Sequence, residues 1–189
     1  MHVILITGMP GVGKTTIMRN LSLELRKRTI KFDGFYTEEL RKSDGERIGF
    51  DIVTFDDKRA PLARVSEFLR NSPAGCRVGK YTVCVSEFES LALPALNERT
   101  ANLLLLDEIG KMELKSAAFG TRLAQIRTRL AQGDSLFFIA TIPLKATLPI
   151  VEQLKDLSET KLFHVTCANR NKILAEIVEA TVRMIGAKM

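Results

Sequence analysis

The chain has 189 residues, 46% of them hydrophobic and 26% charged, which is ordinary for one globular domain. No apolar run approaches the ~20 residues that span a bilayer, and the first expected strand begins by His2, which leaves no room for a targeting sequence. We therefore expect a cytoplasmic protein. The net charge of +6 raises the question of nucleic acid, but the basic residues are scattered and the aromatic content is only 6%, so no nucleic-acid partner is expected.

The three cysteines do not form a metal-binding or disulfide pattern. Cys76, Cys84 and Cys167 include no C-x-x-C pair, and the two histidines lie far from any ligand spacing. Reduced, structural cysteines fit the expected compartment.

The N-terminal segment predicts a strand, a glycine-rich loop and a helix. The apolar run 3–6 is followed by the spacing Gly8-x4-Gly13-Lys14-Thr15, which matches the P-loop pattern in full. Backbone N–H groups of such a loop point at a phosphate chain, and the helix N-terminus adds its dipole. Lys14 is then expected to reach the β- and γ-phosphates, the Thr15 hydroxyl to bind Mg²⁺, and Thr16 to cap the α-phosphate side.

The next elements alternate between helical and strand patterns. We expect a helix from Thr15 to Arg28, a hairpin of strands 35–40 and 47–55 around the turn Ser43–Gly45, and a mixed stretch over 56–75. Within that stretch, Asp56–Arg59 and Asn71–Gly75 are typical of exposed loops. A strand over Lys80–Val85 precedes a helix that begins with a predicted capping box, Ser86 and Glu89.

The second half of the chain indicates an α/β fold. The run Leu103–Leu106 predicts a central parallel strand covered on both faces, because it has no polar alternation. We expect one domain, with an inserted or edge antiparallel element in the first half of the chain. The remaining expected elements are a helix over 116–131, a strand over 136–140, a short helix near 150–154, a strand over 161–165 and a helix over 171–185.

Two acids follow the central strand. Asp107 stands where a Walker B aspartate holds Mg²⁺ beside the P-loop strand, and Glu108 is placed to orient or deprotonate a water for in-line attack. This pair favours hydrolysis. Lys111 has two interpretations, a surface ion pair with Glu113 or a contact with the phosphates.

Four further polar residues also have two interpretations each. Thr141 either senses the γ-phosphate or caps a strand before Pro143. Asn169 and Arg170 either contact the base or ribose, with Arg170 stacked on the ring, or serve as a helix cap and a solvated side chain. Arg77 is either an arginine finger or a surface residue.

These motifs together resemble the small nucleoside-triphosphatase family that includes the human cancer-related nucleoside-triphosphatase and thermophilic prokaryotic relatives. The similarity runs from residue 2 to about residue 185. The segment Asp107–Glu113, Asp-Glu-Ile-Gly-Lys-Met-Glu, is far more specific than a P-loop. The other shared motifs are 8–16, Asp33–Glu38, Arg47–Asp51, Cys76–Tyr81, Ala140–Pro143 and Asn169–Arg170.

The resemblance implies a single P-loop NTPase domain over 1–189 with a RecA-like α/β fold, in which three α/β/α layers contain a mainly parallel central sheet with antiparallel edge strands. It also implies Mg²⁺-dependent hydrolysis of the β–γ bond of ATP, GTP and other nucleoside triphosphates. By position it implies catalytic roles for Glu108, Lys14, Lys111 and Arg77, and metal binding by Thr15 and Asp107. The implied nucleotide-binding residues are Gly8, Met9, Pro10, Gly11, Val12, Gly13, Lys14, Thr15, Thr16, Asp107, Glu108, Gly110, Thr141, Asn169 and Arg170.

Broad base tolerance is expected because a P-loop contacts phosphates and not the base. A monomer is the expected state. One alternative is a nucleotide or nucleoside kinase, although no arginine-rich lid segment follows Asp107. Another is a nucleotide-dependent switch or RNA-associated factor whose hydrolysis only resets a conformation.

Overall fold

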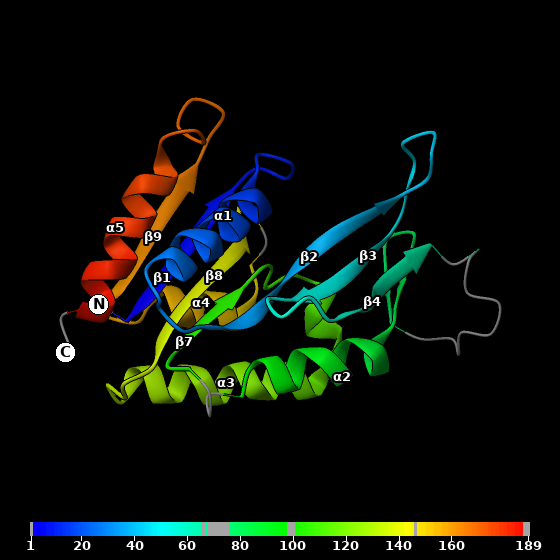
Figure 1. The fold of residues 1–189 in the computed structure, drawn as a ribbon. Helices are drawn as coiled ribbons and strands as arrows, with labels where there is room; N and C mark the ends of the chain where they lie inside the picture. The colour runs from blue at the N-terminus through cyan, green and yellow to red at the C-terminus, as the bar shows by residue number, and fades with distance from the viewer. Residues whose placement is uncertain (1, 66, 68–75, 98–100, 146, 187–189) are drawn as a thin grey trace.

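The computed structural model describes residues 2–65, 67, 76–97, 101–145 and 147–186. A twisted sheet lies between two helical layers, with α1 and α5 on one face and α2, α3 and α4 on the other (Figure 1). The described elements are β1 (Val3–Gly8), α1 (Lys14–Lys27), β2 (Asp33–Arg41), β3 (Arg47–Thr54), β4 (Arg59–Val65), β5 (Arg77–Val78), β6 (Tyr81–Val83), α2 (Val85–Ala95), β7 (Leu103–Leu106), the 3₁₀ turn η2 (Glu113–Lys115), α3 (Ala117–Ala131), β8 (Phe137–Pro143), α4 (Pro149–Lys155), β9 (Thr160–Val165) and α5 (Ile173–Gly186).

The strand order is β5-β6-β4-β3-β2-β7-β8-β1-β9. Neighbouring strands in the part β2-β7-β8-β1-β9 are parallel. Neighbouring strands in the part β5-β6-β4-β3-β2 are antiparallel. The predicted α/β class is confirmed, as is the β2–β3 hairpin. The antiparallel part extends four strands beyond β2, however, and is larger than the edge that the sequence predicted.

The central strand is covered on both faces, as predicted from its unbroken apolar run. Leu104 and Leu106 of β7 pack with α2 and α3, whereas Leu103 and Leu105 pack on the side of α1 and α5. β8 lies between β7 and the P-loop strand β1, so the strand that carries Thr141 is a direct neighbour of the P-loop strand. β8 is also longer than predicted, so that Thr141 pairs with Ile6 inside the strand and does not end it.

Two local predictions in the first half were wrong. Arg59 was expected in an exposed loop but begins β4, whose Pro61 lies at a register shift against β3. A charged start and an internal proline hide such a strand from a pattern search. The predicted capping box is absent, since Cys84 is the N-cap of α2 without a side-chain bond and Glu89 accepts a hydrogen bond from Ser116 instead.

Other predictions differ from the structure only at their ends or cannot be compared. The strand expected over 80–85 is the shorter β6, and the expected loop Asn71–Gly75 lies outside the described residues. No helix in the described part of the chain is long and apolar enough to cross a lipid bilayer.

Candidate nucleotide-binding active site

The loop between β1 and α1 has the conformation that its glycines allow. Gly11 and Gly13 adopt φ values of 75° and 109°, in the left-handed region that favours glycine. A Cβ on Gly8 would lie 2.5 Å from the Val165 carbonyl oxygen, so the start of the loop packs closely on the end of β9, where only glycine fits. Lys14 is largely buried, and its Nζ donates to the Gly8 carbonyl at 3.1 Å. The Lys14 side chain therefore lies over the P-loop, where the phosphates of a bound nucleotide are expected.

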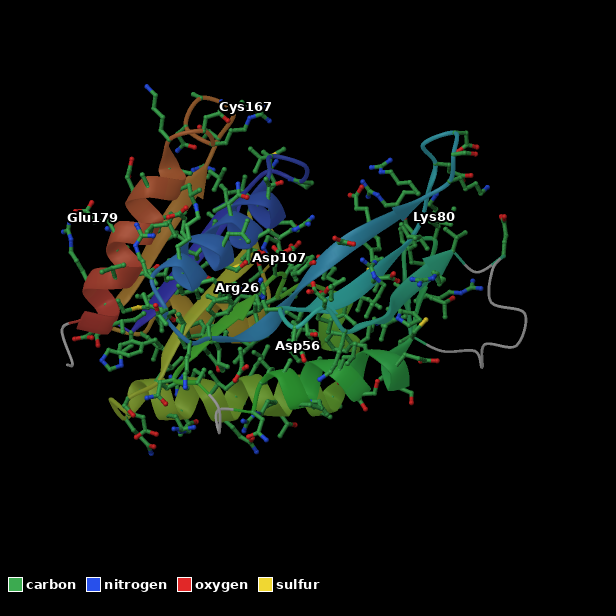
Figure 2. The ribbon with its side chains drawn as sticks, viewed as in Figure 1. Arg26, Asp56, Lys80, Asp107, Cys167 and Glu179 are labelled. Carbon is green, nitrogen blue, oxygen red and sulfur yellow. The ribbon has the colours of Figure 1, made fainter. Side chains whose placement is uncertain are left out.

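Asp107 follows β7 and is almost completely buried among hydroxyl groups, at a point between α1 and β2 in Figure 2. Its Oδ1 accepts from Thr141 Oγ1 at 2.5 Å, and its Oδ2 accepts from Thr37 Oγ1 at 3.4 Å. Burial raises the pKa of Asp107, whereas hydrogen bonds with the Thr141 and Thr15 side chains and the charge of Lys14 lower it. Thr15 and Asp107 thus meet, although β8 lies between β1 and β7.

Glu108 is joined to Asp107 by a cis peptide bond and lines the cleft above the P-loop. Burial raises the pKa of Glu108 above its usual value, the charge of Lys14 lowers it, and the charge of Asp107 raises it further. The two adjacent acids therefore have different surroundings. Asp107 is enclosed, and Glu108 faces the space where a phosphate on the P-loop would lie.

A cleft of about 1010 Å³ opens between the P-loop and the hairpin formed by the end of β2 and the start of β3. It is large enough for a nucleotide-sized ligand. Its floor is the P-loop with the start of α1, its far wall is the β2–β3 hairpin, and the chain after β8 closes one end. The lining residues are Gly8, Met9, Pro10, Gly11, Gly13, Lys14, Thr15, Thr16, Arg19, Thr37, Glu38, Glu39, Arg41, Arg47, Phe50, Glu108, Pro143, Leu144 and Lys145.

Several residues predicted for the site lie elsewhere. Arg77 is exposed on β5, and four strands separate it from β7, so the structure does not bring an arginine finger from this position to the cleft. Lys111 is exposed, and the surface pair expected with Glu113 is not formed because Glu113 is buried against Gly110. Val12 also faces away from the cleft, since its side chain packs in the core.

The loop before α5 is not part of the cleft lining that the structure describes. The Asn169 side chain accepts from the Thr166 N–H and donates to the His164 carbonyl, both at 2.8 Å, so it braces its own loop. Arg170 is exposed. The helix-cap interpretation of Asn169 is wrong in detail, because α5 begins only at Ile173.

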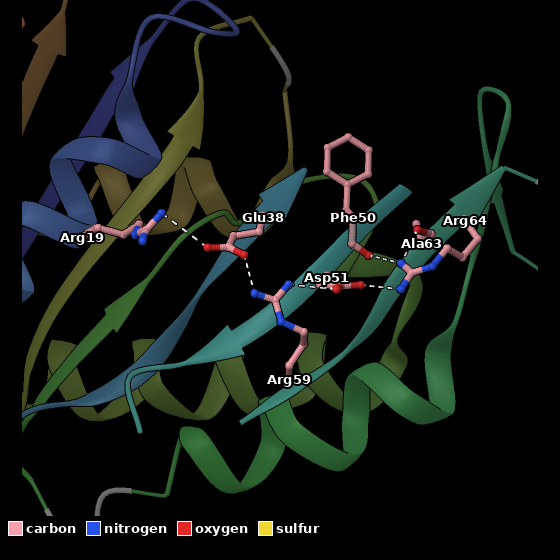
Figure 3. A network of polar contacts seen from close by, with 7 residues as sticks. All are labelled: Arg19, Glu38, Phe50, Asp51, Arg59, Ala63 and Arg64. Carbon is pink, nitrogen blue, oxygen red and sulfur yellow. Dashed lines mark hydrogen bonds and ion pairs between the residues drawn. The ribbon is translucent and has the colours of Figure 1, made fainter. Parts of the chain in front are cut away.

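The sequence patterns did not predict the charged side chains that line the cleft beyond the P-loop. Arg19 lies one turn after Thr15, and its Nη1 lies 3.3 Å from Glu38 Oε1 on β2. Figure 3 shows how this contact continues through Arg59 to Asp51 and on to Arg64. Helical spacing could have placed Arg19 near Thr15, but no local signal pairs it with the hairpin.

The donor groups that meet at Asp107 fit Mg²⁺. A threonine hydroxyl and a carboxylate are hard oxygen ligands, and Mg²⁺ in nucleotide sites takes one or two such protein groups and completes its shell with phosphates and waters. In the described residues, no group of three or more His, Cys, Asp or Glu side chains could hold a metal by itself.

A glycine-rich loop at a helix N-terminus, with an acidic pair across the same sheet edge, defines a P-loop NTPase. A model of the NTPase family matches residues 3–178, so the chain belongs to this family and the resemblance stated from the motifs is confirmed. The chain is 40% identical to the cancer-related nucleoside-triphosphatase of Homo sapiens over 181 residues, which cover 93% of this chain and 94% of that protein. It is also 40% identical over 177 residues to nucleoside-triphosphatase THEP1 of Thermotoga sp. (strain RQ2), covering 93% and 92%.

Solved structures of two relatives have the same fold. The crystal structure of THEP1 from Aquifex aeolicus superposes with a TM-score of 0.76 at 34% identity, covering 94% of this chain and 98% of that chain. The solution structure of a human cancer-related nucleoside triphosphatase superposes with a TM-score of 0.77 at 39% identity, covering 96% and 97%. The similarity therefore includes the antiparallel half of the sheet.

Proposed function

We propose that this protein hydrolyses the β–γ bond of nucleoside triphosphates in a Mg²⁺-dependent reaction with broad base tolerance. The observation that carries the proposal is the meeting of Lys14, Thr15, Asp107 and Glu108 at one end of a nucleotide-sized cleft. The relatives named above are nucleoside-triphosphatases, which supports the same reaction class.

The P-loop holds the triphosphate. Its backbone N–H groups and the N-terminus of α1 bind phosphate oxygens. Lys14 leaves the Gly8 carbonyl and pairs with the β- and γ-phosphates, because a phosphate attracts an ammonium group more strongly than a carbonyl does. Thr15 and Asp107 hold Mg²⁺, which, when bound, neutralises charge on the β- and γ-oxygens.

Glu108 orients the attacking water and accepts its proton. Its carboxylate lines the cleft beside Lys14, and its partial burial moves its pKa toward neutral pH, which suits a general base. Asp107 is enclosed by hydroxyl groups and has no comparable access. The roles of Lys111, Arg77, Asn169 and Arg170 remain predictions, and none of these four lines the cleft among the described residues.

Broad base tolerance follows from what surrounds the phosphates. The described floor of the cleft is P-loop backbone with Lys14, Thr15 and Thr16, which makes no distinction between bases. Asn169 is occupied by hydrogen bonds within its own loop. We also propose that the protein is a cytoplasmic monomer, as expected from the sequence.

Phosphate release tests this proposal. The native chain is incubated with ATP, GTP or CTP, with Mg²⁺ or with EDTA, and diphosphate and phosphate are counted. We expect one phosphate per diphosphate from all three nucleotides with Mg²⁺, no release with EDTA, and no stimulation by saturating RNA. Lys14→Ala should abolish release. Phosphate that appears only on an added acceptor indicates a kinase, and strong RNA stimulation indicates the switch; either result contradicts the proposal.

A further inference from the structure

Glu113 is a buried acid that the proposed reaction does not use. It begins η2, after the turn that carries Glu108, and only 5% of its surface is exposed. A fully buried glutamate is rare unless its carboxyl group is hydrogen-bonded. Its bonding partner therefore indicates what it does.

The carboxyl group of Glu113 binds the turn that follows Glu108. Glu113 Oε2 accepts from the Gly110 N–H at 3.0 Å, and the Gly110 carbonyl accepts from the Leu114 N–H at 3.2 Å. The intervening Ile109 N–H donates to the Thr141 carbonyl of β8 at 3.0 Å. Backbone bonds thus hold this turn at Ile109 and at the Gly110 carbonyl, and the Glu113 side chain holds the Gly110 N–H.

Glu108 and Glu113 pack against the same glycine. A Cβ placed on Gly110 would lie 2.8 Å from Glu113 Oε2, and 3.7 and 3.8 Å from Cγ and Cδ of Glu108. Both side chains therefore border the space beside the Gly110 α-carbon. The Glu113 carboxyl group is bound to the backbone two residues after Glu108.

The charge state of Glu113 suits this arrangement. Burial raises the pKa of Glu113 to about 8, and the charges of Glu108 and Asp107 add to the rise, while the backbone N–H groups of Glu113 itself and of Gly110 lower it. At neutral pH the group is mainly a neutral acid. It can then bind Gly110 without placing a second negative charge behind Glu108.

We propose that Glu113 is a positioning residue for Glu108, holding through Gly110 the turn that aims the Glu108 carboxylate at the attacking water. The inference rests on the proposed function, since it assigns Glu113 a role only through the water-activating group. It predicts that Glu113 affects the rate of hydrolysis and not the binding of nucleotide, because the P-loop is held by other contacts.

Two substitutions at Glu113 separate positioning from simple burial. Glu113→Gln keeps a neutral side chain with an acceptor oxygen, and Glu113→Leu fills similar space without one. With ATP and Mg²⁺, we expect Glu113→Gln to keep kcat within about threefold of the native chain. Glu113→Leu should lose about ten- to a hundredfold in kcat, as small misplacements of reacting groups do. The Kd of a non-hydrolysable ATP analogue should stay within about twofold in both.

A second pair of variants keeps the test decisive if Glu113→Leu does not fold. Gly110 was expected to bind nucleotide, but it is buried and is not among the described residues that line the cleft. Gly110→Ala places a methyl group against Glu113 Oε2 and should therefore lower kcat with unchanged analogue binding. The double variant Gly110→Ala/Glu113→Ala has room for the methyl group, so its loss of kcat should be smaller than the product of the two single losses.

Three results would overturn the inference. The first is equal kcat in Glu113→Gln, Glu113→Leu and the native chain. The second is a parallel loss of kcat and analogue binding, and the third is independent effects of the substitutions at 110 and 113. A native chain without hydrolysis would instead refute the proposed function.

Discussion

Two neighbouring carboxyl groups, Asp107 and Glu108, have different surroundings at the end of β7. Asp107 is enclosed by the hydroxyl groups of Thr15, Thr37 and Thr141, which compensate for its burial. Glu108 lines the open cleft and has the charge of Lys14 as its largest compensating influence. These different environments fit the two proposed roles, metal binding for Asp107 and water activation for Glu108, because surroundings can set different roles for paired carboxylates.

The raised pKa of Glu113 should make the folded protein less stable as the pH rises. Its pKa is raised from the ordinary 4.5 to about 8 in the folded protein, so between these values the folded state keeps a proton that the unfolded chain loses. The free energy of unfolding should therefore fall as pH rises through this window, by at most about 1.4 kcal/mol per pH unit. Glu113→Gln cannot titrate and should lack this contribution.

Urea unfolding of both chains between pH 5 and pH 8 measures the effect. The stability of Glu113→Gln relative to the native chain should increase steadily with pH. A difference between the two chains that stays constant across this range contradicts a raised pKa at Glu113. The exposed Glu179→Gln on α5 is the matched control, because its carboxylate pairs only with a surface arginine.

At the scale of single residues, the sequence predicted what depends on local spacing. The P-loop and the acidic pair follow from spacing and from the apolar strand before Asp107. Arg19, Glu38 and Glu113 could not be assigned, because their roles come from contacts between separate elements or from burial. The arginine-finger interpretation of Arg77 could not be judged from the sequence, because it depends on the strand order, which puts four strands between β5 and β7.

At the scale of elements, a charged ladder joins α1 to the antiparallel half of the sheet. Asp51 on β3 is the buried member, with 8% of its side chain exposed, and it binds Arg59 at 2.9 Å and also Arg64, both from β4. Arg59 in turn binds Glu38, the partner of Arg19. These ion pairs give Arg59 two carboxylate partners on β2 and β3, although the sequence around it resembles an exposed loop.

Removing Asp51 should therefore destabilise the hairpin wall of the cleft. Asp51→Ala leaves Arg64 half-buried without its carboxylate partner, and we expect a loss of about 3 kcal/mol in the free energy of unfolding. Glu179→Ala breaks an exposed pair and should cost about 0.5 kcal/mol or less. Chemical denaturation compares the two variants, and equal losses would show that the ladder adds no more than surface charge.

The predicted elements were accurate where one pattern dominates. Strands β1 and β7 and helices α1 and α3 have strong apolar periodicity and matched closely. β4 was missed because its pairing with β3, including a register shift at Asp51, is a tertiary feature. The missing α2 cap has a similar cause, since Glu89 is engaged by Ser116 from the segment before α3.

At the scale of the whole molecule, the two halves of the sheet have separate tasks. The parallel half brings the P-loop and the acidic pair to one edge, as the carboxyl ends of parallel strands do in α/β proteins. The antiparallel half provides the opposite wall of the cleft through β2 and β3. A nucleotide bound at the P-loop therefore lies between two parts of one continuous sheet.

Water activation by Glu108 is tested most directly by phosphate release from Glu108→Gln, with nucleotide binding measured in parallel and Glu179→Gln as the control. We expect Glu108→Gln to bind ATP, GTP and CTP like the native chain but to hydrolyse all three about a hundredfold or more slowly, the usual contribution of a general base. The control should be indistinguishable from native. Native-like hydrolysis by Glu108→Gln would contradict water activation by Glu108 and with it the central claim.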